Sequence, residues 1–133
     1  MAINEESVTD QKNSLTVCLD NILRHAGITR NTEYDLAQGK TAIQILEENM
    51  TGVQVLDLSG CSLDAVLYYV NQDIPVLAIL DDGEAVLVTG FNEFNVVIME
   101  PSTGKLYKKG MNDATAWFAE NGNHFITYMR TEN

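Results

Sequence analysis

Residues 75–109, PVLAILDDGEAVLVTGFNEFNVVIMEPSTGKLYKK, decide the fold of this chain. Four apolar or β-branched runs in this stretch are separated by short connections rich in Asp, Asn and Gly, a pattern typical of strands joined as hairpins. The runs are residues 75–80, 84–91, 96–99 and 105–108. We therefore predict an antiparallel meander of four strands. The first two runs are almost continuously apolar, which indicates burial on both faces of the sheet.

Helical patterns precede and follow this meander. Over residues 14–26, apolar residues recur at three- and four-residue spacing, which predicts a helix that Ser14 or Thr16 caps. Two capping-box patterns begin at Thr32 and Thr41 and predict two short helices. The other predicted elements are a strand at 53–58, a helix opened by Ser62, a helix opened by Asn112 or Asp113, and a last strand at 125–129.

The order of these elements sets the fold class and the domain organisation. Helices come first and an antiparallel sheet follows, which favours the α+β class over an alternating α/β fold. A chain of 133 residues fits a single domain. We predict a lead-in arm at 1–13, where polar and acidic residues show little periodicity, and one domain at 14–130.

The chain is strongly acidic, with a net charge of -11 and a pI near 4.3. Phosphate backbones and anionic lipids repel such a surface, so neither nucleic acid nor an anionic membrane is an expected partner. No apolar run approaches the ~20 residues of a membrane-spanning helix, and the first residues do not resemble a signal peptide. Cys18 and Cys61 lack metal-type spacing and the density of a disulfide scaffold, while a single bridge between them is left open.

Cys18 is the sharpest candidate for chemistry. A thiol in the first turn of the predicted helix feels the positive end of the helix dipole, which lowers its pKa and favours the thiolate nucleophile. The alternative is a packing role, because cysteine is among the most buried residue types and Cys18 lies near the apolar stripe of the helix. Cys61 precedes a different predicted helix and is a weaker candidate.

A cysteine nucleophile ordinarily needs a base, and the chain has two histidines. His25 follows Cys18 by about two helical turns, roughly 10 Å along the axis, which is too far for a hydrogen bond. His124 precedes the last predicted strand, from which it can approach a site or serve as a structural or surface residue. The sequence around the histidines therefore makes no strong dyad with Cys18.

Asp81, Asp82 and Glu84 crowd oxygen ligands into one connection of the meander. The spacing of an EF-hand loop is absent, and a hairpin turn accounts for the same residues. Gly104 likewise fits a turn and does not resemble a phosphate-binding loop. We therefore predict neither a metal nor a cofactor.

Several of these segments together carry a family resemblance. They are the helix with Cys18, the segment AVLYYVNQDIPVL at 65–77, the strand end TGFNE at 89–93, the run VVIMEPSTG at 96–104 and the last segment at 112–128. In this order and spacing, most of the chain resembles the C39-like peptidase domain of the papain-like cysteine protease superfamily, as found in large proteins of Gram-positive bacteria. The resemblance implies a papain-like α+β fold, with an N-terminal helical half packed on an antiparallel sheet.

The resemblance also implies a split active site. The nucleophile, matched by Cys18, lies on the first helix, and the base and its orienting acid lie on neighbouring strands. The family's histidine stands six residues before the glycine that matches Gly90, and this position is Glu84 here. Glu100, which precedes a proline, replaces the family's Asp or Asn. The oxyanion-hole Gln, six residues before the cysteine in the family, is best matched by Gln11, seven residues before Cys18.

Glu84 in place of histidine changes the chemistry expected of the site. A histidine with a pKa of about 6.5 accepts the thiol proton and then stabilises the thiolate, whereas a carboxylate with a pKa of about 4.3 does neither well. Glu84 and Glu100 beside Cys18 would raise the thiol pKa through like-charge repulsion. The lost acid–base help is worth roughly 10²–10⁴ in rate.

These substitutions predict a catalytically degenerate C39-like domain that acts as a peptide-binding or interaction module. Its expected partner is a cationic or extended peptide, such as a segment of the same parent protein. The alternative is an active cysteine peptidase or acyl-transfer enzyme in which His124, or a residue of a partner, activates Cys18. A third interpretation is a purely structural domain in which the sulfur of Cys18 is completely buried and no cleft surrounds it.

Overall fold

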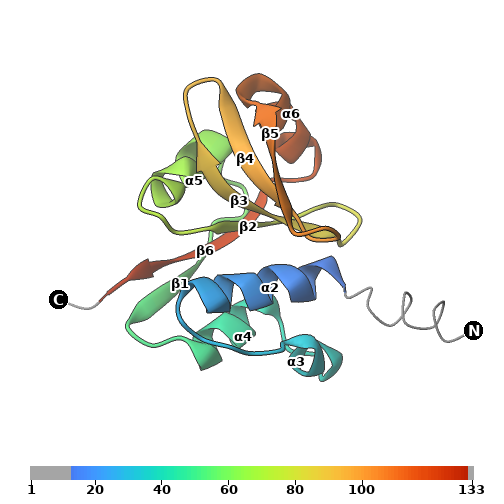
Figure 1. Ribbon diagram of the computed structural model, residues 1–133, viewed down its shortest axis with the longest axis vertical. Helices are drawn as coiled ribbons and strands as arrows, with labels where there is room; N and C mark the ends of the chain where they lie inside the picture. Colours follow the sequence, from blue (N-terminus) through green and yellow to red (C-terminus); the bar gives the residue numbers. More distant parts are fainter. Residues whose placement is uncertain (1–12, 132–133) are drawn as a thin grey trace, which may run out of the picture.

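A computed structural model describes residues 13–131 and contains an antiparallel sheet of six strands with helices on both faces (Figure 1). The strands are β1 (Val53–Asp57), β2 (Val76–Ile79), β3 (Ala85–Phe91), β4 (Asn95–Glu100), β5 (Lys105–Gly110) and β6 (His124–Arg130). Their order across the sheet is β1-β6-β2-β3-β4-β5. The predicted α+β class is confirmed. Of the predicted arm, only Asn13 falls within the described residues.

The predicted meander is confirmed as strands β2 to β5, each antiparallel to the next. Three of the four residues of β2 are buried, and so are the first four residues of β3. Alternate side chains of β3 contribute to different clusters, since Leu87 packs in one and Val88 in the other. The expected burial of both faces is therefore confirmed, and it requires helices on each side of the sheet.

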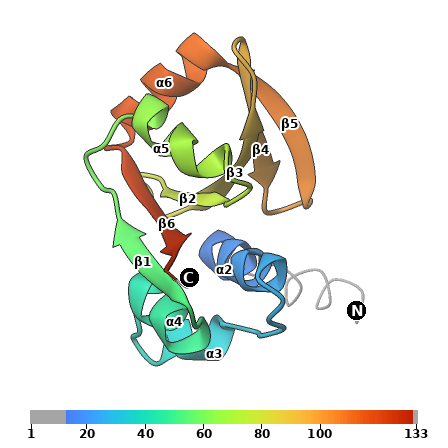
Figure 2. The same cartoon turned by 90° about the vertical axis from the view of Figure 1, so that its left-hand side faces the viewer.

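The helices divide between the two faces (Figures 1 and 2). They are α2 (Ser14–His25), α3 (Glu33–Ala37), α4 (Ala42–Asn49), α5 (Leu63–Val70) and α6 (Met111–Glu120). The α2 and α4 helices pack with one buried cluster of the sheet, and α5 and α6 pack with the other. The predicted N-terminal helical half thus covers one face, while the two later helices cover the opposite one. No helix in residues 13–131 has the length and apolar character needed to cross a membrane.

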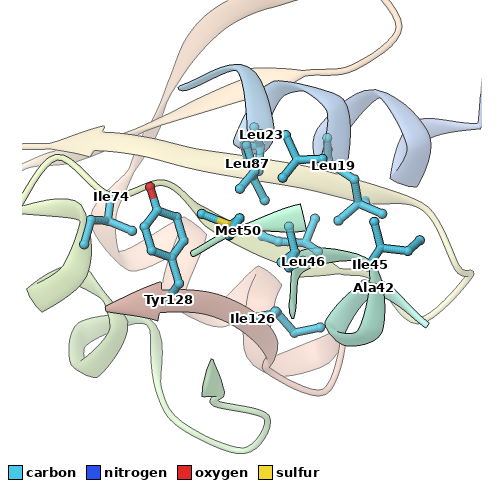
Figure 3. Close-up of a cluster of buried hydrophobic side chains, with 14 of the residues drawn as sticks. Leu19, Leu23, Ala42, Ile45, Leu46, Met50, Ile74, Leu87, Ile126 and Tyr128 are labelled. Atoms are coloured by element: carbon cyan, nitrogen blue, oxygen red, sulfur yellow. The ribbon is translucent and has the colours of Figure 1, made fainter. Parts of the chain in front are cut away.

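The first cluster joins the helical half to the sheet (Figure 3). Leu19 and Leu23 of α2 meet Ile45 and Leu46 of α4, and Tyr128 of β6 closes the cluster from the sheet. All five side chains are at most 1% exposed. Burial of each aliphatic side chain is worth roughly 1.5–3 kcal/mol, so this cluster fixes how α2 lies against the sheet.

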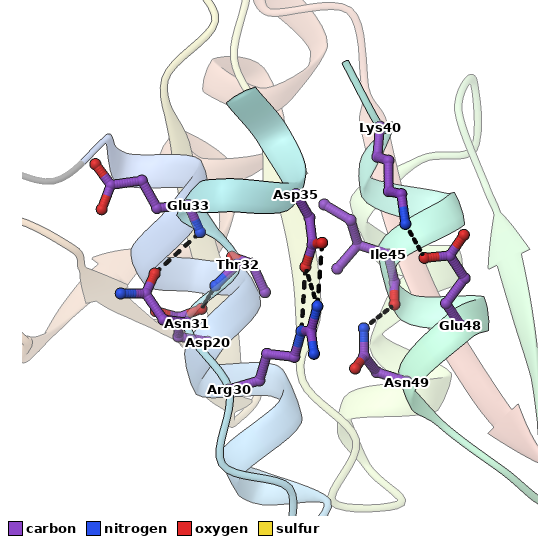
Figure 4. A network of polar contacts seen from close by, with 10 residues as sticks. All are labelled: Asp20, Arg30, Asn31, Thr32, Glu33, Asp35, Lys40, Ile45, Glu48 and Asn49. Atoms are coloured by element: carbon purple, nitrogen blue, oxygen red, sulfur yellow. Dashed lines mark hydrogen bonds and ion pairs between the residues drawn. The ribbon is translucent and has the colours of Figure 1, made fainter. Parts of the chain in front are cut away.

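A buried polar network ties the loop after α2 to that helix (Figure 4). The carboxylate of Asp20 on α2 accepts a hydrogen bond from the backbone N–H of Thr32 at 2.8 Å. The guanidinium of Arg30 donates to both carboxylate oxygens of Asp35, which is buried. The predicted capping box at Thr32 is therefore wrong, because Thr32 makes no side-chain cap and Asp35 binds Arg30.

Two other predicted helix caps also need correction, while those at Thr41 and Ser62 are confirmed. Asn13, rather than Ser14 or Thr16, caps α2, with its side-chain oxygen accepting from the N–H of Leu15 at 2.7 Å. The α6 helix begins one residue before Asn112, after Gly110, and has no side-chain cap. The capping box at Thr41 forms as predicted. The freed hydroxyl of Ser14 makes a long-range contact instead.

Candidate functional site

The first residue of α2 joins this helix to the start of β3. The hydroxyl oxygen of Ser14 accepts a hydrogen bond from the backbone N–H of Ala85 at 2.8 Å, across 71 residues of sequence. Ser14 is half-buried and Ala85 is buried. The contact brings the N-terminal end of α2 against the turn between β2 and β3, where Glu84 lies.

A cleft of about 310 Å³ opens at this junction. Its polar and aromatic lining residues are Ser14, Asp82, Glu84, Glu100, Ser102, Tyr107 and Trp117. They come from α2, the β2–β3 turn, the end of β4 with the turn after it, β5 and α6. Among the described residues that line the cleft there is no histidine, cysteine, lysine or arginine. The cleft therefore combines three carboxylates with two aromatic rings.

Cys18 lies one helical turn beyond Ser14 and does not line this cleft. Since α2 begins at Ser14, Cys18 is its fifth residue, past Val17, whose N–H already bonds to the carbonyl of Asn13. The expected place in the first turn, among unpaired N–H groups, is therefore wrong. The side chain is 0% exposed, and burial, followed by the charge of Glu100, raises the pKa of Cys18 to about 12. The thiol is neutral at physiological pH.

The two glutamates that the sequence resemblance matches to a base and an acid position both lie in the cleft. Glu84 is exposed in the β2–β3 turn, where its backbone N–H donates to the carboxylate of Asp82 at 2.9 Å. Glu100 is half-buried and accepts a hydrogen bond from the hydroxyl of Ser102 at 2.9 Å. Burial and then the charge of Glu100 raise the pKa of Tyr107. Gln11 lies outside residues 13–131.

Neither histidine lines the cleft. His25 lies at the other end of α2, with Nε2 2.9 Å from the carbonyl oxygen of Asp73. His124 lines a separate pocket of about 270 Å³, where its Nδ1 is 3.5 Å from the hydroxyl of Ser59. Both cysteines are free thiols, which answers the question of a bridge between Cys18 and Cys61. No group of three or more His, Cys, Asp or Glu side chains in residues 13–131 is arranged to hold a metal ion.

Four polar or aromatic residues of the cleft are not site residues predicted from the sequence: Ser14, Ser102, Tyr107 and Trp117. The sequence pattern identifies Ser14 only as a candidate helix cap, because its partner Ala85 is too distant in the chain for any local pattern to show the contact. Trp117 already faces a cation, because the ammonium of Lys109 stands 4.8 Å from the centre of its ring. The signal available beforehand was composition, since Trp117 is the single tryptophan of the chain.

The geometry defines an α+β architecture in which the N-terminus of a helix faces two neighbouring strands of an antiparallel sheet. No protein-family model and no curated protein matches the sequence. Among solved structures, the chain is similar to the crystal structure of a Bacillus anthracis protein described provisionally as a C39-like peptidase. The TM-score is 0.74 at 16% sequence identity, over 93% of this chain and 91% of that chain. At this identity the match establishes the fold alone, and it confirms the C39-like fold that the resemblance implied.

Proposed function

We propose that this chain is a catalytically degenerate C39-like domain that binds an extended, cationic peptide segment in the cleft between α2, the β2–β3 turn and α6. The observation that carries the proposal is the set of side chains in this cleft. Carboxylates and aromatic rings line it, and the described lining residues include neither the thiol nor the imidazole that cysteine-dependent peptide hydrolysis needs. A segment of the same parent protein is one source of such a peptide.

The residue that α2 presents to the cleft argues against catalysis. Ser14, not Cys18, stands there, and its hydroxyl is engaged by the N–H of Ala85. A serine is a weak nucleophile unless a neighbouring base removes its proton, and the described lining residues include no imidazole. His124, the base of the alternative enzyme hypothesis, lies against Ser59 in a separate pocket.

The thiol of Cys18 is equally unsuited to the reaction. With a pKa of about 12, only on the order of one thiol in 10⁴ is ionised at pH 8, and the thiolate is the reactive form. The side chain is also completely enclosed by the core. Substrate would have to enter the packed face between α2 and the sheet to reach it.

The ligand class follows from the charges and rings of the cleft. Asp82, Glu84 and Glu100 form a negative cleft that attracts cations and repels acidic peptides. The ring of Tyr107 adds a second preference for an ammonium or guanidinium group, worth roughly 0.5–1 kcal/mol at an exposed site, whereas the ring of Trp117 already faces the ammonium of Lys109. A volume of about 310 Å³ accommodates one or two side chains rather than a large cofactor.

Trp117 supplies a direct readout, because it is the only tryptophan and it lines the cleft. The protein is titrated with a short peptide of alternating Lys and Ser, and with the matched peptide of alternating Glu and Ser. We expect a saturable change of Trp117 fluorescence with the basic peptide, weakened by added salt, and none with the acidic one.

Variants of the carboxylates locate the binding. Glu84→Gln and Glu100→Gln should each lower the affinity for the basic peptide by up to about fivefold, the range expected for a partly screened ion pair. Glu47→Gln is the control, because Glu47 is exposed on α4 and the substitution removes the same charge at a position away from the cleft. Equal affinity for the basic and acidic peptides, or an equal loss in Glu47→Gln, would overturn the proposal.

A further inference from the structure

The sheet has two edges, β1 and β5, and the hydrogen bonds beside β1 fix which of its backbone groups point outward. The N–H of Leu58 donates to the carbonyl of Phe125, and the N–H of Thr131 donates to the carbonyl of Gly52. In an antiparallel ladder, hydrogen-bonded residues alternate along the strand. Even-numbered residues of β1 therefore bond to β6, and the backbone groups of Val53, Val55 and Asp57 point away from the sheet.

These outward groups are unpaired within the part of the chain that the structure describes. β1 is the last strand of the sheet order, and the backbone bonds outside the regular ladders include none to Val53, Val55 or Asp57. Figure 2 shows β1 at the margin of the sheet, with α4 beside its lower half and no further strand drawn next to it. A row of alternating donors and acceptors of this kind accepts a further strand.

The two edges differ in how they are guarded. Edge strands are protected from pairing mainly by lysines, prolines and bulges. β5 carries Lys105, Lys108 and Lys109, whereas β1 reads VQVLD and has neither a lysine nor a proline. Its register against β6 also runs without a shift from Val53 to Asp57. β1 is therefore the edge that is free to pair.

We infer that two copies of this chain pair through their β1 edges, antiparallel about a two-fold axis at Val55. The outward residues are symmetric about this position, so Val55 meets its own copy, and Val53 meets Asp57 of the second copy. Each such pair exchanges two backbone hydrogen bonds. An interface of this kind is isologous and closes after two copies, giving one sheet continuous across the dimer.

Charge complementarity favours a second copy as the occupant. Arg130 lies opposite Val53 on β6, so their side chains share a face of the sheet. In the paired dimer, Asp57 of the second copy lies on the other side of Val53, roughly 10 Å from Arg130 between Cα atoms, or two strand spacings. Extended Arg and Asp side chains span this distance. Arg130 is exposed and makes no ion pair with another described residue, so it is available for this contact.

The net charge of -11 on each copy opposes association, so the contact should be weak and should depend on concentration. Sedimentation velocity over a range of protein concentrations, up to about 1 mM, detects a dimer with a weak dissociation constant. An ionic strength near 0.15 M limits the Debye length to about 8 Å and damps the long-range repulsion. We expect the average mass to rise from 14.7 kDa towards twice that value.

Three variants test which edge pairs. Val55→Pro removes an outward N–H without touching a bond to β6, and Arg130→Glu places a negative charge next to Asp57 of the second copy. Both should keep the mass at 14.7 kDa at every concentration. Lys108→Pro removes the equivalent outward N–H on β5 and should leave dimerisation unchanged. Far-ultraviolet circular dichroism confirms folding, and Arg130→Glu, an exposed change, serves if Val55→Pro fails to fold.

Each opposite outcome overturns the inference. A wild-type mass that stays at 14.7 kDa up to the highest concentration shows that the edge does not pair. A dimer that persists in both Val55→Pro and Arg130→Glu uses another surface. A dimer lost only in Lys108→Pro pairs through β5.

Discussion

Replacing Cys61 by Ser leaves Cys18 as the only thiol, so the reactivity of this one residue can be measured in the native protein. At pH 8 a free thiol with a pKa of about 8.5 is roughly one quarter ionised. A thiol with a pKa of about 12 is ionised on the order of 10³-fold less. The more basic thiolate is intrinsically more nucleophilic, which returns a factor of roughly 30 to 50.

Enclosure adds to this deficit, because Cys18 is 0% exposed and the reagent reaches it only when the protein opens locally. We therefore expect iodoacetamide to modify Cys18 at least about 100-fold more slowly than free N-acetylcysteine at pH 8. Because the pKa is raised, the rate should climb about tenfold per pH unit from pH 7 to 10 without a plateau. Mass spectrometry at timed intervals follows the reaction.

Two controls make the comparison sharp. In concentrated urea the same protein should react like the free thiol. A Ser14→Cys change, made in a chain that also carries Cys18→Ala and Cys61→Ser, places the thiol in the cleft and should react faster than Cys18. Native labelling of Cys18 within about tenfold of the free thiol, with an inflection below pH 8.5, would show that the thiol is neither enclosed nor raised in pKa.

Three further results are expected. Ser14→Ala leaves the buried N–H of Ala85 without its acceptor and should lower the free energy of unfolding by about 1–3 kcal/mol, or roughly 4 °C in Tm per kcal/mol; an unchanged urea midpoint means the contact is absent. Because the pKa of Cys18 is raised in the folded state, the unfolded chain ionises at a lower pH than the folded protein. The contribution of the neutral buried thiol to stability is therefore complete below pH 8.5 and is lost as pH rises towards 12. Cys18→Ala should therefore lose roughly 2 kcal/mol less stability than wild type between pH 8 and 10.5, and parallel losses contradict this. Tyr128→Phe removes a buried hydroxyl that has no partner among the described residues. The free energy of unfolding should therefore stay the same or rise by up to about 1 kcal/mol, whereas a loss larger than this would reveal a partner.

Local patterns predicted most of the fold. The strands of the meander combine β-branched runs with turn residues such as Gly83 and Gly104, whose positive φ values of 89° and 72° suit those turns. Each signal lies within a few residues of the element that it specifies. The capping box at Thr41 is of the same kind, and it formed as predicted.

Long-range partners account for what was not predictable. By residue type, the helix can be capped by Asn13, Ser14 or Thr16. Asn13 caps it, and Ser14 instead binds Ala85, which is distant in the sequence. Ser14 and Cys18 are one helical turn apart on α2. Ser14 lines the cleft, whereas Cys18 lies in the core. The same limit applies to Thr32, whose N–H is taken by Asp20 from another segment.

The charges of the candidate site were easier to anticipate than its nucleophile. Glu84 and Glu100 lie at fixed offsets from strand ends, and the structure places both in one cleft. Of the two carboxylates expected to raise the pKa of Cys18, Glu100 contributes and Glu84 is not among the causes, and burial is the larger cause. The cleft's aromatic wall depends on Tyr107 and Trp117 from different elements, so only the packed structure brings them together.

An amide-resolved NMR titration with the basic Lys-Ser peptide shows whether the acidic cleft binds a cationic segment, because it reports where on the protein the peptide binds. We expect saturable shifts in the amide signals of Ser14, Ala85 and Ser102 and in the indole N–H of Trp117, with none from the acidic peptide. Shifts confined to other parts of the sheet, or the same shifts from both peptides, would contradict an acidic cleft that binds cationic segments.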